Sequence, residues 1–75
     1  MSDNAGTIKG VCHTPMSGIA ELIVVTDDGK TQNLVCDAGP LFRALRASGA
    51  KPGTRITWEM TDWGTMAGFD VEGEN

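Results

Sequence analysis

The sequence has no tyrosine, one histidine, two cysteines and no long apolar run. A single histidine without C-x-x-C or H-x-x-x-H spacing excludes the common zinc motifs. Two cysteines are too few for a disulfide scaffold. No segment approaches the roughly 20 apolar residues that cross a bilayer, and the N-terminus lacks the basic start and apolar core of a signal peptide. We therefore expect a cytoplasmic location and no membrane partner.

Catalytic chemistry is equally sparse. Neighbouring residues on a strand point to opposite faces, so neither Cys12-His13 nor Cys36-Asp37 readily supplies two ligands to one ion. His13 faces away from Cys12 and is therefore a poor general base for that thiol. A nucleophilic Cys36 with His13 as its base, on paired strands, remains an alternative. We expect both cysteines to pack as small hydrophobes. With no phosphate-cradling glycine loop or dinucleotide fingerprint, we predict no enzyme, catalytic residue, metal, cofactor or small-molecule substrate.

The composition is that of a small globular domain. The 75 residues are 40% apolar and 21% charged, with ten glycines, which suits short strands joined by tight turns. A chain of this length forms one domain, with a stability on the order of 4 to 11 kcal/mol. We assign residues 1–75 to that domain, with a loose N-terminus at 1–6 and an acidic C-terminal tail at 73–75.

Alternating apolar residues and turn signals predict five strands, at residues 7–14, 19–26, 31–36, 55–61 and 65–71. The second and third strands form a hairpin around Asp27-Asp28-Gly29. Its register is undecided, because either Ile23 or Val24 opposite Leu34 leaves apolar residues on both faces.

Two glycines predict irregularities in the outer strands. Gly10 indicates a bulge or bend in the first strand, and Gly68 a possible bulge in the fifth. On the fifth strand we expect Ala67, Phe69 and Val71 to share one face.

A single helix of barely three turns is predicted between the third and fourth strands. Pro40 suits its first turn, with Gly39 or Asp37 as the cap, and Gly49 ends it. Leu41, Ala44, Leu45 and Ser48 form its inward stripe.

The order β-β-β-α-β-β in a small, glycine-rich chain is the topology of an OB-like five-stranded barrel. An SH3-like barrel, if the helix is only a long turn, and an open α+β sheet are the alternatives. This likeness concerns the fold and does not by itself give a function.

The charges are unevenly distributed. The net charge is −4, yet residues 38–55 contain four cations and no acid. These cations are candidate partner-binding residues: Arg43, Arg46, Lys51 and Arg55. If they converge on one edge they form a patch for phosphates or an acidic protein. The simpler interpretation is that they solubilise a helix whose other face is buried, perhaps with Glu59 or Asp62 as ion-pair partners.

Trp63 is the other candidate, because the turn Asp62-Trp63-Gly64 either exposes its ring, as at interface hot spots, or folds it over one end of the barrel. Trp58 lies on the inward phase of its strand and is expected in the core, with Ile56 and Met60.

The function that these features favour is non-enzymatic binding. We expect a protein-interaction or accessory module with a protein partner or self-association through an exposed strand edge. A phage or mobile element is a source that suits such a module. The alternative is nucleic-acid binding through the 43–55 cations. The acidic net charge and the lack of aromatics on the second and third strands disfavour it.

Overall fold

The structure is a computed structural model that describes residues 4–13 and 16–72. Its elements are β1 (Ala5–His13), β2 (Ile19–Thr26), β3 (Thr31–Asp37), α1 (Ala38–Ser48), β4 (Arg55–Met60) and β5 (Met66–Val71). The predicted order of five strands and one helix is confirmed. Residues 5–6, expected in a loose terminus, already belong to β1. Residues 1–3 and 73–75 lie outside the described residues.

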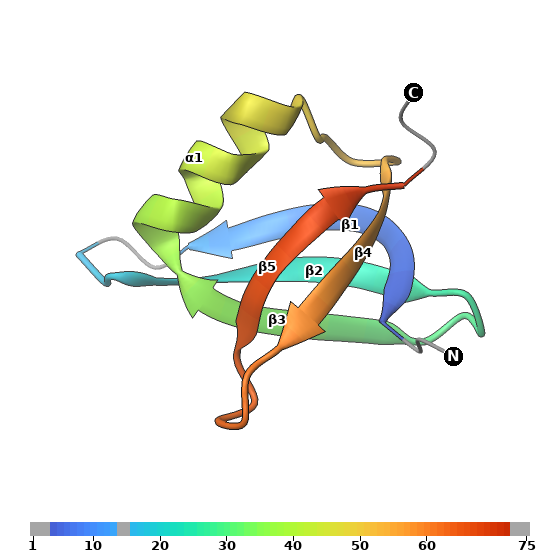
Figure 1. Cartoon of the computed structure of the whole chain (residues 1–75), viewed down its shortest axis with the longest axis horizontal. Coiled ribbons are helices and arrows are strands. Elements are labelled where there is room, and N and C mark those ends of the chain that lie inside the picture. Colours follow the sequence, from blue (N-terminus) through green and yellow to red (C-terminus); the bar gives the residue numbers. More distant parts are fainter. Residues whose placement is uncertain (1–3, 14–15, 73–75) are drawn as a thin grey trace.

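All strand pairings are antiparallel, and the sheet order is β3-β2-β1-β4-β5 (Figure 1). The sheet curves so strongly that Cα atoms of its two edge strands, β3 and β5, come within 8 Å of each other. These edges do not pair in the described part of the chain. The sheet is therefore not closed, and the expected barrel is not confirmed. The SH3-like alternative required the helix to be only a long turn, but the helix has eleven residues.

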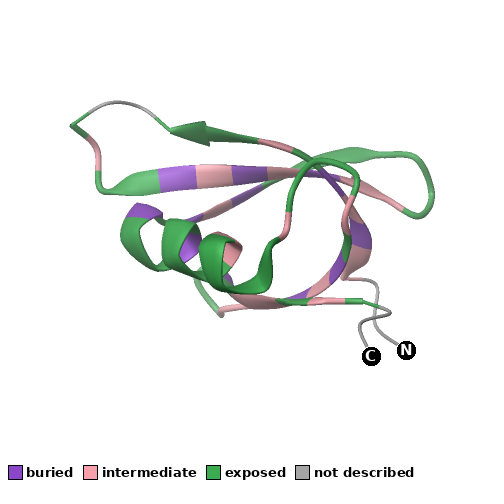
Figure 2. Cartoon of the chain, turned by 90° about the horizontal axis from the view of Figure 1, so that it is seen from above, coloured by how far each residue is buried: buried purple, intermediate pink, exposed green. Residues whose placement is uncertain are grey.

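The core lies between the concave face of the sheet and α1. Buried and less buried residues alternate along β2 and β4, as a sheet with one covered face requires, and Figure 2 shows this alternation. Trp58 is 3% exposed, as predicted. The other buried residues are Ile8, Ala20, Leu22, Val24, Leu34, Cys36, Ala38, Leu41, Ile56 and Met66.

The β2–β3 hairpin adopts a register that neither predicted pairing describes. Leu34 faces Leu22, not Ile23 or Val24. The reason is a three-residue loop: the Thr26 N–H donates to the Lys30 carbonyl at 2.8 Å, and the glycine at position 29 has φ of 87°. A three-residue loop with its last residue left-handed is a common hairpin connection, and it puts Leu22 and Leu34 together on the concave face.

The bulge in β1 explains why Cys12 is exposed instead of packed. Ile8 faces Val24, but Gly10 faces Ile23, so one extra residue enters the strand. This confirms the irregularity predicted at Gly10. An extra residue reverses the alternation, so Cys12 leaves the concave face and is exposed.

A bulge in β5 likewise corrects the predicted face of Ala67. Glu59 pairs with Gly68, whereas Met60 pairs with Met66, so Ala67 is the extra residue. Met66 is buried in its place and Ala67 is exposed, while Phe69 packs against the core as expected.

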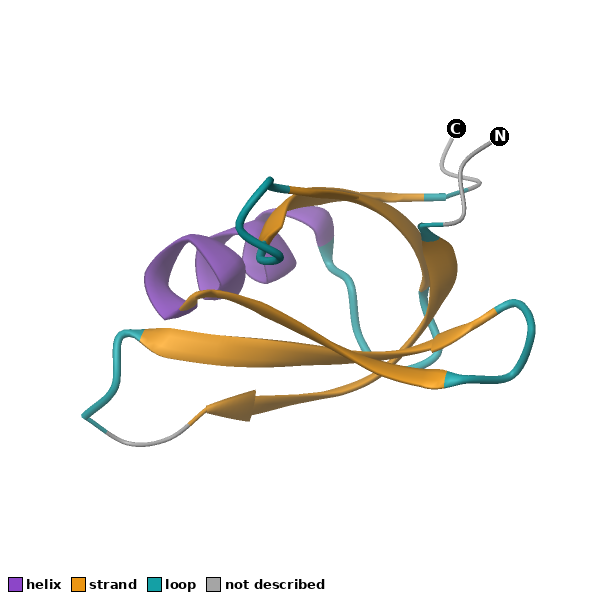
Figure 3. Ribbon diagram, turned by 90° about the horizontal axis from the view of Figure 1, so that it is seen from below, coloured by secondary structure: helices purple, strands orange, loops and turns teal. Residues whose placement is uncertain are grey.

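Helix α1 packs against β2, β3 and β5 (Figure 3). It begins two residues before Pro40, with Asp37 as the N-cap residue, although the Asp37 side chain makes no capping hydrogen bond. Gly49 ends it in the left-handed conformation, with φ of 73° and its N–H bonded to the Leu45 carbonyl. The inward stripe is narrower than predicted. Leu41 is buried and Leu45 half-buried, but Ala44 and Ser48 are exposed.

Candidate functional site

Three of the four predicted basic residues lie on α1 or directly after it. Arg43, Arg46 and Lys51 are exposed. A Cβ atom at Gly39 would lie 3.8 Å from the Arg43 guanidinium, which therefore reaches back toward the start of α1. Lys51 follows the opposite end of the helix, about 15 Å away by the 1.5 Å rise per residue.

Arg55, the fourth cation, is bonded to two carboxylates. Its guanidinium donates to both oxygens of Asp27 at 2.8 and 3.3 Å, and its Nε donates to Glu72 at 3.2 Å. These bonds raise the pKa of Arg55 and lower that of Asp27. Pairing was expected with Glu59 or Asp62 instead. The contact ties the β2–β3 turn to the start of β4 and the end of β5, which is a structural role.

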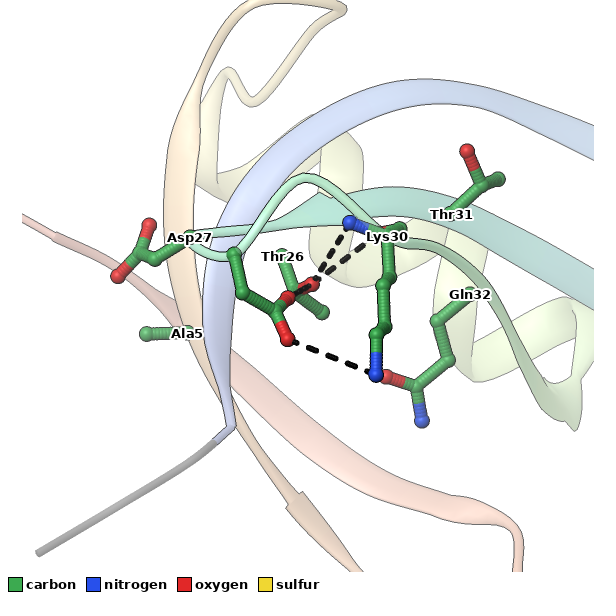
Figure 4. A pocket seen from close by; sticks show the side chains of 7 residues that line it. Ala5, Thr26, Asp27, Lys30, Thr31 and Gln32 are labelled. Atoms are coloured by element: carbon green, nitrogen blue, oxygen red, sulfur yellow. Dashed lines mark hydrogen bonds and ion pairs between the residues drawn. The ribbon is translucent and has the colours of Figure 1, made fainter.

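A hollow of about 650 Å³ lies beside the β2–β3 turn (Figure 4). Three of its polar residues bond to one another. The Thr26 hydroxyl donates to the Asp28 carboxylate, the Lys30 N–H donates to Thr26 Oγ1 at 3.3 Å, and the Lys30 ammonium lies 3.9 Å from Asp28. The Thr26 bond lowers the pKa of Asp28. Thr26, Asp28 and Lys30 therefore satisfy one another, and these bonds stabilise the β2–β3 turn.

A more promising feature is the gap between the two sheet edges, which we call the seam. Two adjoining hollows of about 400 and 390 Å³ open there. Four residues line both, two from β3 and two from β5: Cys36, Asp37, Met66 and Ala67. Toward the β4–β5 turn the seam is bounded by Ile19, Val35, Thr61 and Thr65. Under the helix it is bounded by Pro40, Leu41, Ala44, Gly68 and Phe69.

The lining of the seam is mainly apolar and has one charged side chain, Asp37. Ile19 is 53% exposed, although it begins a strand rich in apolar residues. Sequence reasoning missed it as a site residue, because the apolar run of β2 does not tell which face is covered. An exposed isoleucine beside two apolar hollows is a feature of surfaces that bind other macromolecules.

Trp63 stands next to the seam. Its side chain is 90% exposed, which answers the question left open by the sequence. The turn that carries it is well bonded: the Thr61 hydroxyl oxygen accepts the N–H groups of Trp63 and Thr65 at 3.2 and 3.3 Å, and Gly64 has φ of 86°. Thr61 and Thr65 also line the seam. The fold thus holds the backbone of an exposed indole beside an apolar gap.

The structure does not bring together the thiol and imidazole of a nucleophilic site. The His13 Nε2 atom bonds to the Ser17 carbonyl at 2.8 Å, and its ring contacts Phe42 edge-on with centroids 5.4 Å apart. The Cys36 thiol lies 3.8 Å from the carbonyl oxygens of Ala20 and Leu34. Burial, with a smaller effect of the charge on the next residue, raises the pKa of the Cys36 thiol, which disfavours the reactive thiolate.

Within the described residues, no helix is long and apolar enough to span a membrane, and no group of three His, Cys, Asp or Glu side chains could hold a metal ion. No family model matches the chain, and searches of curated proteins and of solved structures found no significant match.

Proposed function

We propose that this chain is a non-enzymatic protein-binding module that uses the seam and Trp63 as its binding surface. The observation that carries the proposal is a 90% exposed tryptophan, on a well-bonded turn, beside a gap lined by apolar side chains. Large aromatic side chains supply much of the energy of protein interfaces.

The proposal includes a fold assignment. Two edges of one curved sheet that approach within 8 Å would complete a five-stranded barrel if they paired. We propose that the domain is an OB-like barrel left open between β3 and β5. The interface then lies where the sheet stays open, because unpaired edges need to be covered.

Arg43, Arg46 and Lys51 remain candidate partner contacts outside this surface. Lys51 follows the end of α1 opposite to the one that Arg43 reaches toward, and Arg55 pairs with Asp27, so these cations give no specific support to a phosphate-binding patch. Protein binding at the seam is therefore preferred to nucleic-acid binding.

Photocrosslinking from position 63 tests the proposal. A photoreactive phenylalanine analogue replaces Trp63 in one variant and the exposed helical residue Ala47 in a matched control. Expressed in the source cells, the first variant should capture a discrete protein species that the control does not. Equal capture from both positions, or capture of nucleic acid alone, would show that the seam is not a protein-binding surface.

A further inference from the structure

The free edge of β3 determines what kind of partner the seam can take. The Thr26 N–H donates to the Lys30 carbonyl, and the Ala38 N–H donates to the Gly18 carbonyl. Bonded pairs alternate along an antiparallel ladder, so the even-numbered residues of β3 bond to β2. The N–H and C=O groups of Thr31, Asn33 and Val35 consequently point away from β2, and β3 has no other neighbour among the described strands.

This row of donors and acceptors ends at the apolar seam. Val35 lines the same hollow as Thr61 and Thr65, next to the turn that carries Trp63. An extended segment bonded to the β3 edge would run toward this turn and could place one apolar side chain in the hollow. Two paired strands lie about 4.8 Å apart, so a strand cannot fit between β3 and β5 where they approach within 8 Å. The residues of β3 that line both hollows are Cys36 and Asp37, so the segment lies along Thr31 to Val35 and ends at the seam.

Charge indicates the composition of the segment. Asp37 is the one charged side chain in the seam lining, and Asp62 beside Trp63 is exposed. The nearest cation along β3, Lys30, already faces Asp28 at 3.9 Å. With a net charge of −4, two copies of this chain would repel each other at this surface.

We propose that the β3 edge binds an extended segment of another protein, rich in alternating apolar and basic residues, as an added strand. Main-chain hydrogen bonds give such complexes their affinity, and alternate side chains give them specificity. This inference rests on the proposed function and names the partner chemistry of the same surface.

The probe is a synthetic nine-residue peptide of alternating lysine and valine with blocked ends. Two comparison peptides carry glutamate in place of lysine, or N-methyl groups along the edge that would face β3. Binding of the lysine peptide should shift the amide resonances of Thr31, Asn33 and Val35 and the emission of Trp63. The N-methylated peptide should bind at least about tenfold more weakly, because two or more hydrogen bonds are lost. The glutamate peptide should also bind more weakly at low salt, because its charges are repelled by Asp37 and Asp62. Absence of these shifts, or equal binding of all three peptides, would overturn the inference.

Variants of the protein provide the matched controls. Val35→Pro removes one outward N–H while leaving the ladder to β2 intact, since proline is tolerated where the strand N–H faces solvent. It should weaken peptide binding about tenfold. Asp37→Asn should weaken it about two- to fivefold at low salt, whereas Asp70→Asn, an equal charge change on the outer face of β5, should have no effect. If Val35→Pro unfolds, the N-methylated peptide makes the same test on the intact chain.

The outcomes also separate this inference from the proposed function. Crosslinking from position 63 that persists after Val35→Pro, in a folded protein, would keep the binding module but exclude strand addition. Loss of capture at position 63 itself would refute the proposed function. Concentration-dependent dimers with protected amides at Thr31 and Asn33 would make a second copy the occupant, and the inference of a basic partner would be wrong.

Discussion

Gly6 is the position where the curved sheet leaves least room. It pairs with Thr26 on one side and with Ile56 on the other, where β1 is bonded along both edges. A Cβ atom there would collide with the carbonyl oxygen of Val25 and lie 3.0 Å from its carbonyl carbon and 3.1 Å from the Thr26 Cα atom. These are backbone atoms, which cannot move aside without disturbing the β1–β2 ladder.

We therefore expect Gly6→Ala to destabilise the fold. Overpacking of this kind costs about 1 to 3 kcal/mol, a large share of a stability on the order of 4 to 11 kcal/mol. At about 4 to 8 °C per kcal/mol for a domain of this size, a loss of about 2 kcal/mol lowers Tm by about 8 to 16 °C. Urea unfolding, followed by far-UV circular dichroism and by the fluorescence of the buried Trp58, measures the difference.

Gly10→Ala is the matched control on the same strand. A Cβ atom at Gly10 meets nothing within 4 Å, and its φ is not positive. Alanine there also restricts the unfolded chain, so the variant should lie within about 1 kcal/mol of the parent. If Gly6→Ala were as stable as Gly10→Ala, β1 would not approach β2 this closely.

Three further outcomes are expected. Iodoacetamide should modify Cys12 at once in the folded protein, while Cys36, which is 8% exposed and has a raised pKa, should react only upon unfolding; mass spectrometry that finds equal rates would contradict the burial of Cys36. Asp27→Asn should lower Tm at pH 7. Arg55 lowers the folded pKa of Asp27 below 3.8, so the stability contributed by the ion pair is present above pH 3.8 and is lost as the pH falls through the folded pKa. The Tm values of parent and variant should therefore converge in acid. A Tm difference that does not change with pH would exclude this ion pair as the cause. Single- and double-stranded oligonucleotides should not bind at low salt, and a steep salt-dependent affinity would instead favour the basic-patch alternative.

The secondary structure was largely predictable from the sequence, because local signals determine it. The strand of 19–26 has the predicted bounds. The helix ends before Gly49, as predicted, because the left-handed conformation at that position favours glycine. Trp58 follows from the clean alternation of β4. Each of these features depends on residues within a few positions of one another.

The sequence could not show which face of the sheet each side chain joins after a bulge. One extra residue reverses which face a side chain joins. Cys12 and Ala67 were misplaced for this reason, on strands whose glycines had indicated an irregularity without giving its position. The hairpin register failed similarly, since apolar residues on both faces of β2 accept several pairings.

The seam could not be predicted from the sequence for a different reason. It lies between β3 and β5, which are far apart in the sequence and do not pair. Whether β3 and β5 join depends on the accumulated curvature of the whole sheet, to which the close approach at Gly6 and two bulges contribute. The same curvature brings the Thr61–Thr65 turn to the end of β3, so that Trp63 borders a free strand edge. If a partner strand covers that edge, bends elsewhere in the sheet determine which residues lie close enough to contact it. A change at Gly6 would then alter binding at the seam without touching any residue that lines it.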